Sequence, residues 1–173
     1  MSITVTSNQL RSLIAQLEKA RDLAKEQFPD SLFVFPDDEK PLPAVLASAA
    51  ERCEMQITAL QTALQDYNLR IRVKVGGSTI TLAEAIKRKG ALERMETLWG
   101  SAVAQKTDSY RDKTVRDPMQ ERAKPAIKPS AAKAEVLRLS NLRRALMAAV
   151  NDANSTLLVL DGYDESLLVG PTE

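Results

Sequence analysis

The sequence predicts a mainly α-helical protein, a four-helix antiparallel bundle with a small β-hairpin element, and we expect it to form oligomers. Apolar residues recur at spacings of three and four in four long segments, which is typical of amphipathic helices. Aromatic residues make up only 4% of the 173 residues, so Leu, Ile, Val and Ala must build the core, which suits helix packing. A chain of this length can form one core, and we expect a single helical domain over 1–173.

The first helix is expected over residues 6–28, where Thr6 or Ser7 can cap its start. The next segment is bounded by Pro29 and Pro43 and cannot be helical throughout. Its residues 32–35 are all apolar, so we expect this loop to pack against the body or against a neighbouring subunit.

The second helix is expected from Pro43, a favourable first-turn proline, to about Tyr67. Its apolar residues step in threes and fours: Leu46, Ala49, Cys53, Ile57, Leu60, Leu64 and Tyr67. This coiled-coil-like seam indicates that helices also meet across subunits, so the expected protein partner is a second copy of the chain.

The pattern then changes to alternation, with Arg70, Arg72 and Lys74 between aliphatic residues, so a strand with one cationic side is expected. Gly76 and Gly77 permit a tight turn, and residues 78–80 can return as the partner strand. A capping box over residues 81–84 then opens the third helix.

The third helix is expected to turn these residues inward: Leu82, Ile86, Leu92, Met95, Trp99 and Val103. A basic, proline-punctuated loop follows over about 107–129, and such a long loop is functional or mobile. The last helix starts near Ser130 and is expected to bury Val136, Leu139, Leu142, Leu146 and Val150. A short strand follows before a loose C-terminal tail over about 161–173.

The absence of histidine excludes Ser-His-Asp and Cys-His catalysis and the usual zinc sites. The acidic runs Asp37–Glu39 and Asp161–Glu165 lack calcium-loop spacing, so no metal or cofactor is expected, and we expect no enzyme. Cys53, the single cysteine, excludes an internal disulfide and favours a cytoplasmic setting. No apolar run reaches the roughly 20 residues of a membrane span.

Charge is divided unevenly along a chain whose net charge is only +1. Residues 70–144 hold 18 Lys or Arg against 8 Asp or Glu, a local net charge of +10. Such a division favours an anion-binding face or the association of opposite surfaces, although cations scattered on solvated faces would give the same count. The overall charge and the few aromatics argue against a dedicated nucleic-acid-binding protein.

The candidate ligand-binding residues surround the double glycine and extend into the basic loop: Arg70, Arg72, Lys74, Lys87, Arg88, Tyr110, Arg111 and Arg116. Arginine forks suit phosphate, and the helix start beside the glycines adds free backbone N–H groups. Tyr110 could stack on a base or ring. The alternative is a solvated cationic strand whose arginines pair with acids of an adjacent subunit.

The run TLAEAIKRKGALERM, with Gly77 before it and NDANSTLLVL after the last helix, resembles the septicolysin-like family of small helical bacterial and phage proteins over about residues 57–160. The matching positions are Thr81, Leu82, Glu84, Ala85, Ile86, Arg88 and Leu92, with Arg111, Arg116 and Lys128 in the basic loop and Asn154 near the end of the last helix. Gly90 and Ser155 depart from the family pattern. The resemblance implies an all-helical, oligomeric fold.

Two functions remain open from the sequence. The first is a non-enzymatic oligomeric binding protein that sequesters a small anionic, nucleotide-derived ligand, ADP-ribose-like or a cyclic nucleotide; in a phage it would serve as an anti-defence protein. The second is a structural helical assembly protein without a small-molecule ligand, in which the charge division drives contacts between subunits.

Overall fold

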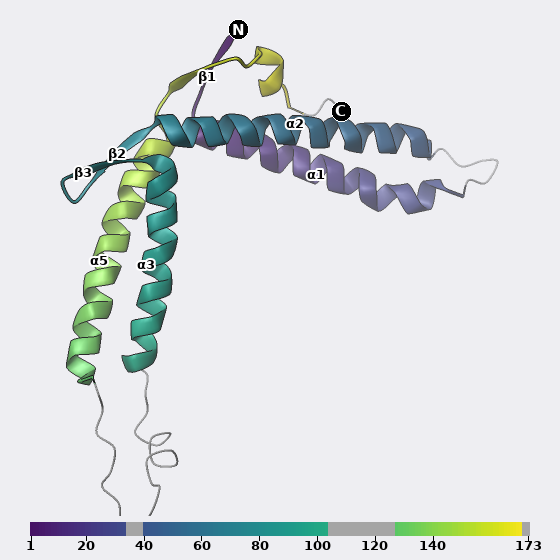
Figure 1. The fold of residues 1–173 in the computed structure, drawn as a ribbon. Coiled ribbons are helices and arrows are strands. Elements are labelled where there is room, and N and C mark those ends of the chain that lie inside the picture. Colours follow the sequence, from purple (N-terminus) through teal and green to yellow (C-terminus); the bar gives the residue numbers. More distant parts are fainter. Residues whose placement is uncertain (34–39, 104–126, 171–173) are drawn as a thin grey trace, which may run out of the picture. The chain divides into compact units, whose positions relative to one another are not determined.

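The computed structural model describes residues 1–33, 40–103 and 127–170 and confirms the mainly helical class (Figure 1). Its described residues divide into two compact units. Unit 1 comprises residues 1–72, 81–83 and 151–173, and unit 2 comprises residues 73–80 and 84–150. Each unit contains one pair of long helices, so the single domain and the four-helix bundle stay predictions. None of the described helices combines the length and the hydropathy needed to cross a membrane.

Unit 1 is built on the helices α1 (Ser7–Ser31) and α2 (Pro43–Arg70), which pack side by side (Figure 1). The predicted cap of α1 is confirmed, because the Thr6 side chain accepts from the Gln9 backbone N–H in a capping box. The end predicted near residue 28 is wrong, since α1 continues through Pro29 to Ser31. Pro29 is tolerated in this last turn, where the Ser31 hydroxyl donates to the Phe28 carbonyl at 2.7 Å.

A two-stranded antiparallel sheet covers part of unit 1, and sequence reasoning predicted only one of its strands. The strand β4 (Leu158–Asp161) was expected, whereas β1 (Ser2–Val5) was missed because four residues carry too little alternation. Ser2 pairs with Asp161 and Val5 with Leu158. The side chains that this sheet adds to the core of unit 1 are Ile3, Val5 and Leu160.

The segment after β4 was predicted to be loose, but residues 165–169 are held to α2. Asp164 caps the 3₁₀ helix η1 (Glu165–Leu168) by accepting from the Ser166 backbone N–H, which lowers the pKa of the Asp164 carboxyl. The Gln56 amide of α2 donates to the carbonyl oxygens of Leu167 at 3.3 Å and Val169 at 2.6 Å.

Tyr67 is fully buried in the core of unit 1, and its hydroxyl hydrogen bonds to several segments of the chain. Its hydroxyl lies 2.7 Å from the carbonyl oxygen of Ala153 and 2.6 Å from that of Thr156, so one proton is shared between two acceptors. The backbone of Ser7 also hydrogen bonds to this hydroxyl. The phenol therefore joins the start of α1, the end of α2 and the turn that precedes β4.

Unit 2 contains most of the helices α3 (Leu82–Val103) and α5 (Pro129–Asn154), with the strands β2 (Arg72–Val75) and β3 (Ser78–Thr81) before α3. The predicted hairpin is confirmed, and its turn is made by Gly76 and Gly77 at φ values of +58° and +83°. Glycine suits both positions because side chains disfavour this left-handed region.

The inward-facing residues predicted for α3 and α5 are confirmed only in part. Leu82, Leu139, Leu146 and Val150 are buried. Met95 and Leu142 are each 42% exposed, so both predictions of burial are wrong. The Arg143 guanidinium of α5 donates to the Glu96 carboxylate of α3 at 2.8 Å, and this ion pair joins the two helices.

We expect Tyr67→Phe to destabilise the protein by about 1–3 kcal/mol, because removing the hydroxyl leaves the Ala153 and Thr156 carbonyls without their donor. Urea unfolding should show a lower midpoint with an unchanged slope. Tyr163→Phe is the control, since the half-buried Tyr163 makes no hydrogen bond with any described residue through its hydroxyl. An unchanged midpoint for Tyr67→Phe would contradict this role.

Burial also raises the pKa of Tyr67 above its ordinary value, and the hydrogen bond from Ser7 opposes this effect. Below about pH 10 the phenol is neutral in both the folded and the unfolded chain, so its full contribution is present. Above that pH the unfolded chain ionises first, and stability is lost as pH rises toward the folded-state pKa. The stability difference between the wild type and Tyr67→Phe should therefore shrink from pH 9 to pH 11; a constant difference would refute the assignment.

Candidate functional site

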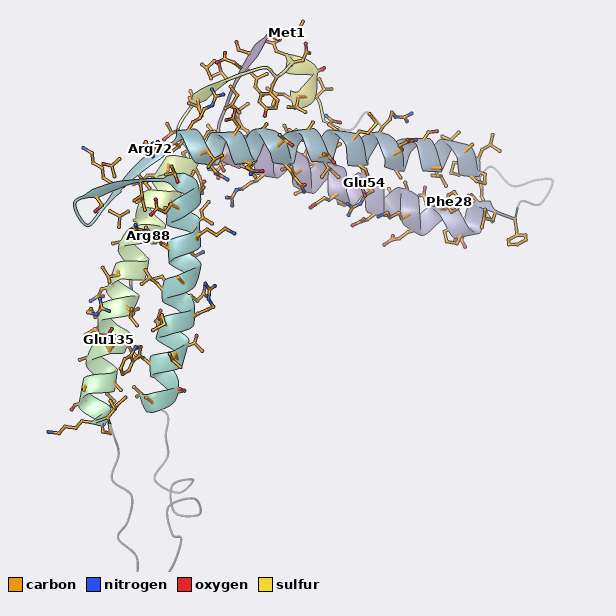
Figure 2. The ribbon with its side chains drawn as sticks, viewed as in Figure 1. Met1, Phe28, Glu54, Arg72, Arg88 and Glu135 are labelled. Atoms are coloured by element: carbon orange, nitrogen blue, oxygen red, sulfur yellow. The ribbon has the colours of Figure 1, made fainter. Side chains whose placement is uncertain are left out.

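The candidate site is built around the β2–β3 hairpin and the start of α3. These elements carry four of the predicted ligand-binding residues: Arg72, Lys74, Lys87 and Arg88. Val73 and Ile80 of the hairpin are buried, whereas Arg72 and Lys74 are exposed. The predicted alternation therefore holds over β2, and Arg72 lies at the start of this strand (Figure 2). Side chains two residues apart on a strand project to the same side, so these two cations form a local pair.

Arg70 does not belong to this strand, which corrects its predicted place beside Arg72. The helix α2 continues to Arg70, because the Ile71 backbone N–H still donates to the Tyr67 carbonyl at 3.0 Å. The Arg70 guanidinium donates to Asp66 at 2.9 Å and lies 3.8 Å from a carboxylate oxygen of Asp161. Arg70 is thus occupied by two acids of its own unit.

Arg88 is also paired within its own helix. It lies on α3 (Figure 2) and donates to the Glu84 carboxylate at 2.6 Å, one helical turn away. Such exposed pairs contribute little stability, typically 0.2–1 kcal/mol. Arg72, Lys74 and Lys87 differ, because none of them lies within ion-pair distance of a carboxylate in residues 1–33, 40–103 and 127–170.

The predicted convergence of these cations into one pocket stays a prediction. Arg70 and Arg72 belong to unit 1, whereas Lys74, Lys87 and Arg88 belong to unit 2. The other predicted site residues, Tyr110, Arg111 and Arg116, lie outside the described residues. The structure therefore describes one local cation pair on β2, together with Lys87 on the first turns of α3.

The described cavities lie elsewhere, and none is lined by a predicted site residue. A cavity of about 400 Å³ in unit 1 lies between β1 and η1 and touches Ser2, Thr4 and Glu165. A mostly apolar groove of about 350 Å³ runs between α3 and α5 in unit 2. Its lining residues are Gly100, Val103, Lys133, Val136, Leu137 and Ser140.

Sequence reasoning missed this groove because it placed Val103 and Val136 in a closed core. Both are only half-buried in the α3–α5 pair, and Leu137 is 59% exposed. The signal that could have revealed the groove is Gly100, since a Cβ added there would have no atom within 4 Å. A glycine inside a helix costs stability, and here it keeps the helix surface open.

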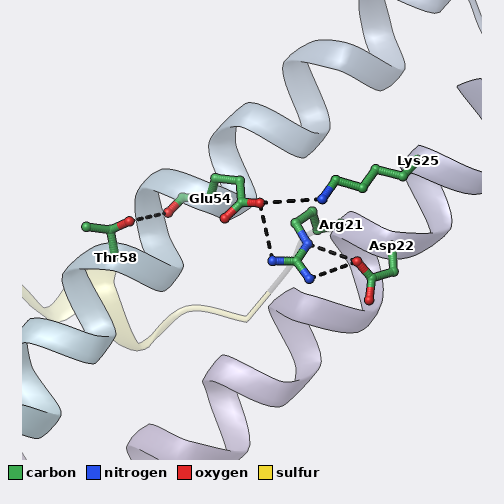
Figure 3. Close-up of polar contacts among 5 residues, drawn as sticks. All are labelled: Arg21, Asp22, Lys25, Glu54 and Thr58. Atoms are coloured by element: carbon green, nitrogen blue, oxygen red, sulfur yellow. Dashed lines mark hydrogen bonds and ion pairs between the residues drawn. The ribbon is translucent and has the colours of Figure 1, made fainter.

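The densest polar cluster in unit 1 joins α1 to α2 (Figure 3). Arg21 donates to its neighbour Asp22 at 2.9 Å and to Glu54 of α2 at 3.2 Å, and Lys25 lies 3.7 Å from the same Glu54 oxygen. The hydrogen bond to Asp22 is the main cause that raises the pKa of Arg21. Every charge in this cluster is balanced, so it is a clamp between helices and leaves no free ligand-binding group.

Little in the described residues offers catalytic or metal-binding chemistry. No group of three or more Cys, Asp or Glu is placed to hold a metal ion in the described part of the chain. Cys53 is a free, half-buried thiol on α2. Two buried amide oxygens, Asn68 Oδ1 and Asn154 Oδ1, have no hydrogen-bond partner among the described residues, and sequence reasoning did not single them out as acceptors.

Comparisons with known proteins inform the fold and leave the function open. No family model matches the sequence, and no curated protein matches it. Among solved structures, the chain is similar to a functionally unknown conserved protein from Corynebacterium diphtheriae, with a TM-score of 0.68. The two are 15% identical, and the match covers 90% of this chain and 99% of that one. At this identity the likeness concerns the fold alone, and the resemblance to the septicolysin-like family stays a prediction.

Proposed function

We propose that this protein is a non-enzymatic helical assembly protein, in which further copies cover the outer faces of the α3–α5 pair and complete a helical bundle. The observation that carries this proposal is the number of large apolar side chains that these two helices expose. They are Met95, Leu98, Leu137, Leu142 and Met147. Exposed apolar residues are common on soluble proteins, so an interface depends on how these five are arranged on their helices.

The outer face of α3 has the spacing of a helix-packing seam. Ala91, Met95, Leu98 and Ala102 follow each other at intervals of four, three and four residues, which places them along one stripe. Leu98 is 61% exposed, and the residues that α3 turns toward α5 lie on a different side of the helix. A seam of this kind buries its knobs only against another helix, and we propose that a second copy supplies it.

We expect Met95→Ser/Leu98→Ser to weaken self-association by about tenfold or more, because two apolar anchors are removed from the seam. Sedimentation velocity over a concentration series measures this effect, and circular dichroism verifies the helix content. Met55→Ser is the matched control, since Met55 is 70% exposed on α2, a helix that does not carry the seam. A wild-type chain that sediments as a 19.0 kDa monomer at every concentration would contradict the proposal.

A second candidate function, sequestration of a small anionic ligand, is supported by the cations that have no described acid partner. Arg72 and Lys74 project together from β2, and Lys87 is exposed near the start of α3. An arginine fork beside a lysine suits a phosphate or pyrophosphate. We propose a nucleotide-derived signal, ADP-ribose-like or a cyclic nucleotide, as the ligand, and capture of such a signal would suit a phage anti-defence protein.

Under this second function, Arg72→Glu/Lys74→Glu should abolish the heat of binding in calorimetric titrations with ADP-ribose and with cyclic dinucleotides. The reversal replaces attraction for phosphate with repulsion. Lys19→Glu/Arg52→Glu is the control, because it changes the net charge equally at exposed positions on α1 and α2. No heat with any of these ligands and the wild-type chain would remove the ligand function and leave the assembly function standing.

A further inference from the structure

Leu32 and Phe33 follow the end of α1, and both side chains are exposed in unit 1. Phe33 is 81% exposed and Leu32 is 54% exposed. A phenylalanine side chain has a large apolar surface, and removing that surface from water favours a contact. The sequence predicted that this loop packs against the body or a neighbouring subunit. Leu32 and Phe33 are exposed in unit 1, and Val34 and Phe35 lie outside the described residues.

The groove between α3 and α5 has the complementary properties. Its volume of about 350 Å³ lies at the lower end of the range of about 300–1,000 Å³ that is typical of small-molecule sites. It therefore suits one or two side chains better than a nucleotide. Val103, Val136 and Leu137 give it an apolar lining, and the open surface at Gly100 admits a flat ring.

Charge complementarity fixes the orientation of a docked segment. Lys133 lines the groove, three and four residues before Val136 and Leu137, so its ammonium lies at one end of the apolar lining. Asp30 precedes Phe33 by three residues at the end of α1. Neither Lys133 nor Asp30 is ion-paired within residues 1–33, 40–103 and 127–170. A carboxylate on a docked segment would complement this ammonium.

We propose that Leu32 and Phe33 of one copy insert into the α3–α5 groove of a second copy, with Asp30 paired to Lys133 across the contact. This inference rests on the proposed assembly function and names one of its interfaces. The inserting segment and the groove are different surfaces of the same chain, so two copies can exchange the contact reciprocally in a closed dimer, or the contact can repeat head to tail in a ring or filament.

Disulfide trapping tests the contact directly in the full chain. In a Cys53→Ser background, Leu32→Cys is mixed with Ser140→Cys, so that Phe33 remains in place to dock. We expect a crosslinked dimer of the two variants. It should form at least about tenfold faster than in the control mixture, in which Leu23→Cys replaces Leu32→Cys, because Leu23 is similarly exposed on α1. A rate equal to that of the control overturns the proposal, and so does a Leu32→Cys/Ser140→Cys double variant that closes only within one chain.

Charge exchange gives a second readout in sedimentation velocity. Asp30→Lys and Lys133→Asp should each weaken self-association by about tenfold, and the combined variant should recover it, since the pair is restored in reverse. Gly100→Trp should also weaken it by filling the groove. If all these variants self-associate as strongly as the wild type, the docking contact alone is overturned. A wild type that is monomeric at every concentration contradicts the assembly function itself.

Discussion

The hydrogen bonds of the buried Tyr67 hydroxyl are the constraint around which unit 1 is organised. Burying a phenol without a partner is costly, and Tyr67 meets this cost by donating to the turn that follows α5 while the backbone of Ser7 bonds to it from the start of α1. The same turn leads directly into β4, whose pairing with β1 returns the chain to the start of α1. One side chain of α2 thus joins the start of α1 to the end of α5 and the turn after it, which lie far apart in the sequence.

The cations of the chain serve two different purposes. Arg21 and Arg143 each donate to a glutamate of another helix, and Arg70 and Arg88 are satisfied by acids one helical turn away. These four arginines are therefore engaged in ion pairs within the fold. Arg72, by contrast, projects from a short strand toward solvent, as Lys74 does. The local excess of positive charge therefore overstates the number of cations that are free to meet an anion, and this is why assembly has stronger physical support than ligand capture.

A pair of helices can bury only one face of each member, and this limit explains why α3 and α5 expose so many apolar residues. Leu139 and Leu146 are buried, whereas Met95 and Leu98 are exposed and are not covered by α5, the other described helix of unit 2. The groove that opens at Gly100 is a further consequence, since a helix surface without side chains leaves space beside its partner. These exposed apolar residues are the surface that a further copy would cover in the proposed assembly.

The sequence by itself determined the helical class, a cap at Thr6 or Ser7, the start of α2 at Pro43 and the hairpin turn at its two glycines, because these depend on local periodicity and backbone sterics. It could not determine that Ser2–Val5 pairs with β4, since this pairing depends on hydrogen bonds between residues far apart in the sequence. Nor could it determine that α2 extends to Arg70, because the alternation of cations and aliphatic residues that starts at Arg70 favours a strand. Helical spacing also placed Met95 and Leu142 inward, although a stripe of apolar residues does not reveal how many partners will cover it. Only the tertiary structure decided which apolar faces are buried and which cations are paired, because burial and ion pairing are properties of neighbours in space.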